Sequence, residues 1–386
     1  MSRLDELIAE LCPDGVEYKA LEEIASIELG RRVTKAEIDR NPGQYPVWHG
    51  GETPMGYINK TNCPPYTVLV ANTGSIGYVN WISIDSWCSD AASMVIVKKD
   101  ILSSRFLYHF LKSKEFKIKK FRRIGGVPTL ELRKLRSFPI PLPPLQVQRE
   151  IVRILDNFTE LTAELTAELT ARRKQYEYYR DLLLTFGDEV PRVAIDDLFN
   201  IRNGYTPSKS NKEYWENGVI PWFRMEDIRE NGRILSNALQ YVSINAVKGR
   251  PFPANSIIIS TSATIGEHAL IQTEFLANQR FTILSLKNEY QDVNIKYLFY
   301  YCYILGEWCK NNLTLGHFAS VDMVAFKKFR IPLPPLKEQE RIVAILDRFD
   351  ALCNDLTSGI PAEIEARQKQ YEYYRDKLLS FKEVKA

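Results

Sequence analysis

The chain has 386 residues, which exceeds one ordinary domain of about 100–200 residues and suits two or three. Its composition, 45% hydrophobic and 26% charged, is typical of a folded chain and excludes global disorder. A net charge of +3 does not by itself indicate a nucleic-acid partner. There is no apolar run of membrane-span length and no signal peptide at residues 1–11, so we expect a cytoplasmic protein.

Short apolar runs rich in β-branched residues predict strands in two parts of the chain. Thr67–Ala71 and residues 93–97 are such runs, and residues 72–77 read as a tight turn between them. Residues 105–111 have the spacing of a short amphipathic helix. Each segment has a counterpart about 190 residues later, at Ser256–Ser260, 282–286, 261–266 and 296–302. The repetition indicates two globular parts of one fold, of mixed α+β class.

Two blocks rich in helix-forming residues follow each globular part. Residues 140–158 match residues 331–349 at 13 of 19 positions, and residues 171–186 match residues 366–381 at 13 of 16. In the first copy, apolar residues alternate by fours and threes from Ile151 to Leu183, the spacing of a coiled-coil seam. About 40 helical residues would form a rod of about 60 Å.

The two helical copies differ in their middle. The first contains the tetrapeptide TAEL twice, at residues 162–169, and each unit adds about one turn or about 6 Å. The second has Gly359 and Pro361, which predict a break near residues 358–361 with Pro361 opening a new helix. We hypothesise that the two long helices pack antiparallel about a pseudo-twofold axis, forming a cyclic repeat. The N-terminal pattern of Leu4, Leu7, Ile8 and Leu11 would then stand in for a helix end.

No motif predicts catalysis or a metal site. Cys63-Pro64-Pro65-Tyr66 resembles the Asn/Asp-Pro-Pro-Tyr signature of amino-methyltransferases, but a thiol cannot replace the amide or carboxylate as acceptor, so we expect a structural turn. Residues 74–77 lack the spacing of a hydrolase elbow, and no phosphate loop or histidine pair with metal-ligand spacing occurs. Six scattered cysteines without a C-x-x-C pair predict reduced, packed thiols.

Charge is concentrated in one place. Residues 112–136 contain ten basic residues against two acidic ones, which indicates a phosphate-binding surface, although a merely solvated basic face has the same pattern. The candidate DNA contacts of the first domain are Arg31, Arg32, Lys35, Lys117, Lys119, Lys120, Arg122 and Arg123. Those of the second domain are Tyr205, Thr206, Lys209, Lys212, Arg224, Lys248 and Arg250. We expect Trp222 in the core.

The repeated I-P-x-P-P-L and K-Q-Y-E-Y-Y-R-D blocks, together with the TAEL repeat, resemble the DNA-specificity subunit of type I restriction-modification systems, in the subclass with TAEL spacers. The resemblance covers essentially the whole chain. It implies two target-recognition domains that each read one half of a split, asymmetric site in double-stranded DNA. The expected boundaries are 1–20 for an N-terminal helical stub, 21–138 and 188–330 for the recognition domains, and 139–187 and 331–386 for the spacer helices.

The same resemblance implies partners and no enzymatic activity in this chain. Two methyltransferase subunits would carry S-adenosylmethionine, and restriction-translocase subunits would use ATP and Mg²⁺, in a bacterial or archaeal cytoplasm. By position, the residues for partner docking or helix packing are Tyr176, Tyr178, Tyr179, Tyr371, Tyr373 and Tyr374. The alternative from another class is a coiled-coil scaffold that binds proteins and lacks DNA specificity.

Overall fold

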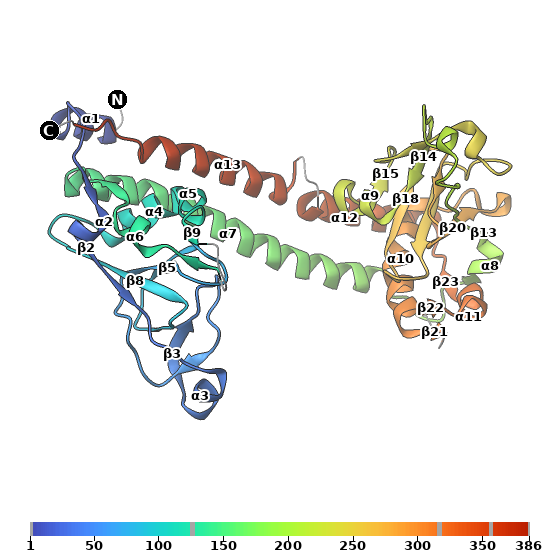
Figure 1. Ribbon diagram of the computed structural model, residues 1–386. Helices are drawn as coiled ribbons and strands as arrows, with labels where there is room; N and C mark the ends of the chain where they lie inside the picture. Colours follow the sequence, from blue (N-terminus) through green and yellow to red (C-terminus); the bar gives the residue numbers. More distant parts are fainter. Residues whose placement is uncertain (1–2, 124–127, 315–318, 355–357, 385–386) are drawn as a thin grey trace. The chain divides into compact units, whose positions relative to one another are not determined.

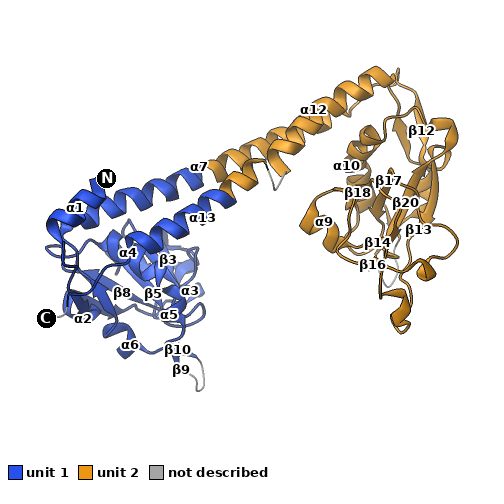
Figure 2. Ribbon diagram, turned by 90° about the horizontal axis from the view of Figure 1, so that it is seen from above, with its two compact units in different colours: residues 1–164, 365–386 blue, residues 165–364 orange. Residues whose placement is uncertain are grey.

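The computed structural model describes residues 3–123, 128–314, 319–354 and 358–384. They form two compact units, unit 1 with residues 1–164 and 365–386, and unit 2 with residues 165–364 (Figure 2). Helix α7 (Leu145–Leu183) is continuous through residue 164, so its first half belongs to unit 1 and its second half to unit 2.

Unit 1 is built on an antiparallel sheet. Its strands, in order across the sheet, are β2 (Ala25–Leu29), β8 (Ala92–Val97), β5 (Thr67–Ala71) and β6 (Val79–Ile82). A smaller sheet has the order β4 (Tyr57–Ile58), β3 (Pro42–Trp48) and β7 (Trp87–Cys88), with β3 and β7 parallel. The remaining elements are α1 (Arg3–Leu11), β1 (Tyr18–Ala20), α2 (Leu21–Ile24), α3 (Lys35–Arg40), α4 (Ser104–Ser113), α5 (Glu115–Lys119), β9 (Arg122–Arg123), β10 (Thr129–Leu130), α6 (Leu132–Arg136) and β11 (Pro139–Pro141).

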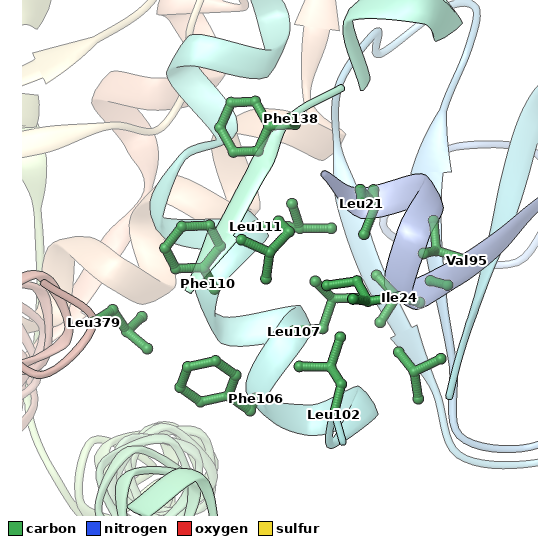
Figure 3. Close-up of a cluster of buried hydrophobic side chains, with 14 of the residues drawn as sticks. Leu21, Ile24, Val95, Leu102, Phe106, Leu107, Phe110, Leu111, Phe138 and Leu379 are labelled. Carbon is green, nitrogen blue, oxygen red and sulfur yellow. The ribbon is translucent and has the colours of Figure 1, made fainter. Parts of the chain in front are cut away.

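Helix α4 connects the sheet of unit 1 to the long helices (Figure 3). Phe106 and Phe110 point from α4 toward Leu379, which follows α13 (Ile360–Leu378), while Leu107 points toward Ile24 beside the sheet. All five side chains are buried in one apolar cluster. Burying this apolar surface fixes the sheet to the helix pair.

Unit 2 repeats the plan of unit 1 (Figure 1). Its sheet has the order β13 (Phe199–Asn203), β20 (Phe281–Leu286), β17 (Ser256–Ser260), β18 (His268–Ile271) and an added β15 (Ile234–Leu235). Its smaller sheet has the order β16 (Tyr241–Val242), β14 (Ile220–Phe223) and β19 (Leu276–Ala277), again with one parallel pair. The remaining elements are β12 (Arg192–Ala194), α8 (Ile195–Leu198), η1 (Lys212–Tyr214), α9 (Met225–Asn231), η2 (Ile244–Ala246), η3 (Asn288–Tyr290), α10 (Ile295–Asn311), β21 (Leu313–Thr314), β22 (Ser320–Val321), α11 (Met323–Lys328), β23 (Arg330–Pro332) and α12 (Leu336–Asn354).

The helices of each unit pair antiparallel. In unit 1, Leu142 before α7 donates its N–H to Glu17 O at 2.9 Å, and the adjacent Val16 donates to Lys382 O beyond α13 at 2.9 Å. The start of α7 and the end of α13 therefore lie together. In unit 2, Leu333 before α12 donates to the carbonyl oxygen of residue 191, just after α7, at 2.8 Å. The antiparallel pairing predicted from the repeats is thus present inside each unit.

The predicted strands at Thr67–Ala71 and Ser256–Ser260 are confirmed with their exact bounds. The predicted helix break is also confirmed, because α12 ends at Asn354 and α13 begins at Ile360; residues 355–357 lie outside the described part. The helix expected at 296–302 is longer and spans Ile295–Asn311, since its apolar pattern continues through Leu305 and Cys309.

The interpretation of the N-terminal segment was wrong. Arg192 of unit 2 donates to Phe186 O, at the end of α7, at 3.0 Å. The corresponding bond in unit 1 runs from the Tyr18 hydroxyl to Phe381 O at 3.1 Å. The C-terminal segment, and not α1, therefore holds the place of the helix end in unit 1. Buried Leu379 occupies the position that Leu184 has in unit 2, and α1 packs as an additional helix.

Candidate nucleic-acid interface

In each domain, a glycine that follows the first strand of the sheet lies against the end of a strand of the smaller sheet. Gly30 lies against the end of β7, and Gly204 lies against the end of β19. A Cβ atom added to Gly30 would lie 2.1 Å from the carbonyl oxygen of Ser89, and one added to Gly204 would lie 2.3 Å from that of Asn278. Neither glycine has a positive φ, so the close approach requires glycine and a turn conformation does not. The residues that follow are therefore held at the same point in both domains.

A tryptophan indole fixes the residue after each glycine. Trp87 Nε1 donates to Arg31 O at 3.0 Å, and Trp222 Nε1 donates to Tyr205 O at 3.1 Å. Trp87 lies on β7 and Trp222 on β14, so different strands supply one interaction. Trp222 is 3% exposed, which confirms its predicted place in the core.

An open cleft of about 620 Å³ lies in the second domain between the segment after Gly204, strand β14 and the turn after β19. Four of the predicted contacts line it, namely Thr206, Lys209, Lys212 and Arg224. The side chains of Asn278, Gln279 and Arg280 line it as well. Gln240, Glu216 and Glu226 also line it, so the fold gathers four cations, three amides and two carboxylates around one concave surface.

Tyr205, Lys248 and Arg250 do not line this cleft. The Tyr205 hydroxyl accepts the Lys248 N–H at 2.8 Å and donates to Ala246 O at 3.3 Å, and the Lys248 ammonium lies 5.2 Å from the Tyr205 ring centre. These contacts tie the loop after η2 to the segment after Gly204. Lys248 and Arg250 are exposed on that loop.

Arg224 carries a partly desolvated charge into the cleft. Its guanidinium lies 5.6 Å from the Trp222 ring centre. Its Nε is buried and has no hydrogen-bond partner among the described residues, since the Glu226 carboxylate is 3.9 Å away. A buried donor without an acceptor costs free energy, so an acceptor entering the cleft would bind favourably there.

Asn278, Gln279 and Arg280 were not identified from the sequence. They follow Thr206 by more than 70 positions, and only the fold brings them to the same cleft. The Thr206 hydroxyl donates to the Gln279 side-chain oxygen. Arg280 is exposed, and within the described residues its side chain forms no ion pair. Their only sequence signal is their position directly after β19, which no motif marks.

In the first domain, Arg31, Arg32 and Lys35 are exposed at the corresponding place. Arg31 N–H donates to Cys88 O at 2.9 Å, which matches the bond from Tyr205 N–H to the end of β19. His49, the residue after β3, has its Nδ1 2.8 Å from Ser89 Oγ. The framework is the same as in the second domain, and the chemistry of its side chains differs.

The basic segment 112–136 is partly neutralised by its own two acids. The Lys112 and Lys119 ammonium groups lie 2.9 and 3.3 Å from the Glu115 carboxylate. Burial alone would raise the pKa of Glu115, but hydrogen bonds from Lys112 and the Val79 N–H outweigh it and lower that pKa. Lys120 lies over the Phe116 ring at 4.5 Å.

Four predicted contacts of this segment are exposed without an ion pair in the described part of the chain, namely Lys117, Lys120, Arg122 and Arg123. Arg122 and Arg123 form β9, whose partner β10 is held by a bond from Leu130 N–H to Asn72 O at 2.8 Å. This hairpin therefore lies beside the 72–77 turn. Residues 124–127 of the basic segment lie outside the described residues.

The tyrosines of the repeated helix ends have matched environments in the two units. Tyr176 and Tyr371 pack inward, whereas Tyr178 and Tyr373 are 65% and 63% exposed. Tyr179 stacks on Phe349 with ring centres 5.9 Å apart, and Tyr374 stacks on Phe158 at 5.5 Å. Each unit thus presents one exposed tyrosine beside a half-exposed one. Neighbouring rings lie 5.4 Å apart in unit 2 and 5.3 Å apart in unit 1.

A polar cluster joins α4 to both long helices in unit 1. Asp156 of α7 lies 2.8 Å from Arg105 Nε and 2.8 Å from His109 Nε2. His109 Nδ1 lies 3.4 Å from the hydroxyl of Tyr371 on α13. Burial lowers the pKa of His109 despite the Asp156 carboxylate. In unit 2, Lys296, Tyr300 and Asp347 make the corresponding contacts at 2.7 Å.

The Cys63-Pro64-Pro65-Tyr66 segment forms the expected structural turn. Thr67 Oγ1 donates to Pro64 O at 2.7 Å, and Ser256 Oγ makes the same bond to Pro253 O at 2.7 Å in the second domain, where no such signature occurs. All six cysteines are buried and free, as predicted. Burial raises the pKa of the Cys63 thiol to about 11, which makes it a poor nucleophile.

A larger cleft of about 1310 Å³ in unit 2 lies among α7, α9, α10 and α12, and none of the predicted DNA contacts lines it. Two ion pairs lie in its lining, Arg233 with Glu267 at 2.5 Å and Lys296 with Asp347 at 2.7 Å. The predicted contacts Thr206, Lys209, Lys212 and Arg224 therefore gather at the smaller cleft. Within the described residues, the helices are too short or too polar to cross a bilayer.

The chain matches a known family along nearly its whole length. A family model for the type I restriction modification DNA specificity domain matches residues 13–172 and again 188–366. The specificity subunit of the Escherichia coli type I restriction enzymes EcoR124I/EcoR124II is 35% identical over 412 residues, covering 99% of this chain and 97% of the relative. The specificity subunit of the E. coli EcoprrI enzyme is 60% identical over 206 residues, 51% of each chain. The chain therefore belongs to the type I DNA-specificity family, as the repeated blocks predicted.

Solved structures agree on the fold. The S subunit of a type I restriction-modification system from M. genitalium aligns over 96% of this chain and 98% of its own, with a TM-score of 0.57 and 17% identity. A chain from a structural study of type I complex assembly and conformational transition aligns over 95% and 98%, with a TM-score of 0.63 and 18% identity. Two repeated α+β domains joined to long helices are the shared architecture.

Proposed function

We propose that this chain is the sequence-reading subunit of a type I restriction-modification complex and that each globular domain reads one half of a split, asymmetric DNA site. One observation carries the proposal. The two domains keep the same glycine and indole contacts and change the side chains around them, from Arg31, Arg32 and His49 to Tyr205, Thr206 and Arg224. Changed side chains on one backbone suit two different half-sites.

The chain itself would perform no catalysis. Its one methyltransferase-like signature is a turn that recurs in the second domain without the signature residues. Methylation would belong to two modification subunits with S-adenosylmethionine, and cleavage to restriction-translocase subunits with ATP and Mg²⁺. The assembly would act on double-stranded DNA in a bacterial or archaeal cytoplasm.

The repeated helix ends would dock the modification subunits. Tyr178 with Tyr179, and Tyr373 with Tyr374, form two exposed aromatic pairs with the same packing beneath them. Aromatic side chains are enriched at the centres of protein interfaces. Two copies of one surface on a single chain suit two copies of one partner.

The experiment that tests the proposal is co-expression with the cognate modification subunits and single-molecule sequencing of a plasmid. We expect methylation at one split motif. Any motif must depend on this chain, so the modification subunits alone are the control. A stable complex that methylates nothing would favour the protein scaffold, and methylation by the chain alone would contradict the assignment of catalysis to the partners.

The TAEL repeats would set the distance between the half-sites. They lie in the continuous part of α7, where a third unit adds four residues, about 6 Å, or nearly two base-pair rises. Inserting TAEL after residue 169 should lengthen the methylated motif's spacer by one or two base pairs and leave both half-sites unchanged. An unchanged spacer, or an altered half-site, would refute the ruler; a four-residue insertion in the exposed 236–237 loop is the control.

A further inference from the structure

The turn that follows the parallel strand has the same backbone in both domains. Residues 89–91 follow β7, and Ala92 N–H donates to Ser89 O at 3.1 Å. Residues 278–280 follow β19, and Phe281 N–H donates to Asn278 O at 3.0 Å. The carbonyl of the last turn residue then accepts an N–H from the residue that follows a central sheet strand, Asn72 after β5 in one domain and Thr261 after β17 in the other. The two turns are therefore equivalent position by position.

Their side chains are unrelated. The first turn reads Ser, Asp, Ala and the second reads Asn, Gln, Arg. Arg280 thus stands where the first domain has Ala91. Its turn is rigid, because the Asn278 side chain accepts the Arg280 N–H at 3.0 Å and Thr206 holds Gln279. The Arg280 side chain itself is exposed at the cleft.

Another cation of the cleft behaves in the opposite way. Lys209 follows Gly204 by five residues, and Lys35 follows Gly30 by the same number, so the two domains keep a lysine at one position. Both lysines are exposed. Every DNA half-site offers the same phosphates, so a phosphate contact can be kept in both domains, whereas a base contact must change with the base.

We propose that Arg280 reads a guanine in the half-site of the second domain and that Lys209 contacts a phosphate there. This rests on the proposed function. The planar fork of an arginine donates two hydrogen bonds to guanine O6 and N7 in the major groove, which no other base offers. Ala91 cannot make that contact, so the first domain reads the corresponding position without it.

The test compares Arg280→Ala with Lys209→Ala, each as a complex with the modification subunits. The probes are duplexes with the split motif of the unaltered complex and with single base-pair substitutions in it, and the readout is Kd at several salt concentrations. For Arg280→Ala we expect binding to the full motif about 5- to 150-fold weaker, and tolerance of any base pair at one G·C position of one half-site. For Lys209→Ala we expect equal weakening on all duplexes and a salt slope smaller by about one ion.

The proposal would be overturned if the Arg280→Ala complex discriminates at every base pair as strongly as the unaltered complex does. This holds whether its overall binding is weaker or unchanged. Arg280→Lys keeps the charge and loses the fork, so it should also lose discrimination while it keeps more affinity than alanine. This variant answers the question if alanine perturbs the turn. The proposed function fails separately, if the unaltered complex prefers no duplex at all.

Discussion

The candidate interfaces of the two domains keep one backbone and change their side chains, whereas the two helix ends keep both. Gly30 and Gly204 make the same close approach, yet Ala91 and Arg280 share a position without sharing chemistry. On the helices, the inward, exposed and stacked tyrosines recur in the same order. The changed side chains of the candidate interfaces suit two different ligands, whereas the repeated tyrosines of the helix ends suit two copies of one ligand.

A mutation in the core of one unit tests whether the two units are stabilised independently. Phe106→Ala removes a fully buried ring from between the sheet and the long helices of unit 1 and should destabilise that unit by about 3–5 kcal/mol. Hydrogen exchange resolved by unit is the measurement. We expect faster exchange at β5 and β8 and unchanged exchange at β17 and β20. Equal acceleration in both sheets would mean that the units unfold together.

Single and double substitutions likewise test the two repeated tyrosine pairs one at a time. Tyr178→Ala and Tyr373→Ala each remove an exposed ring from one docking surface, and a central interface ring contributes about 2 kcal/mol or more, or about 30-fold in affinity. Native mass spectrometry should detect one bound modification subunit for either single variant and none for the double variant at equal concentration. Tyr57→Ala, with a ring 54% exposed on the small sheet, is the control.

Two bound subunits in the double variant, with unchanged affinity, would contradict the docking role. Those tyrosines would then serve only the packing of the helices. In that case the thermal stability of the variants should change instead of their stoichiometry.

Much of this architecture follows from local patterns. The strand Thr67–Ala71 is a short run rich in β-branched residues and buried on both faces, and the helix break follows from Gly359 and Pro361. The attachment of the C-terminal segment at Val16 could not be predicted, because one isolated bridge and a few backbone bonds make it. Arg280 was missed for a related reason, since only the tertiary fold sets it beside Thr206.

The sheets of the two units differ at one buried position in whether its side chain can titrate. Burial, with the nearby Arg233 charge, lowers the pKa of His268 to about 3, and its Nε2 has no partner among the described residues. The unfolded chain therefore binds one more proton than the folded one below about pH 6.5, and unit 2 loses stability as the pH falls from there toward 3. The equivalent residue in unit 1 is Val79, which is buried and cannot titrate.

His268→Val should remove this loss. The free energy of unfolding of unit 2 in the variant, minus that in the unaltered protein, should therefore be about 2 kcal/mol larger at pH 5 than at pH 7. Urea unfolding followed by hydrogen exchange of β17 at the two pH values measures it. Unit 1 should keep its own weaker response, because burial also lowers the pKa of His109. An unchanged pH dependence of β17 would show that the imidazole is protonated in the folded protein.

The smallest expected effect concerns a hydroxyl that only one unit has. Tyr297 begins the buried face of α10 where α4 has Phe106, and its hydroxyl donates to Pro332 O at 2.8 Å. Tyr297→Phe keeps the ring and leaves that buried carbonyl without this donor, at a cost of about 1 kcal/mol. The reverse change, Phe106→Tyr, forces a hydroxyl into a packed cluster and should cost more in unit 1. If Phe106→Tyr lowered the free energy of unfolding by less than Tyr297→Phe does, a backbone carbonyl of unit 1 would be in place to accept the new hydroxyl. The two cores would then be interchangeable at this position.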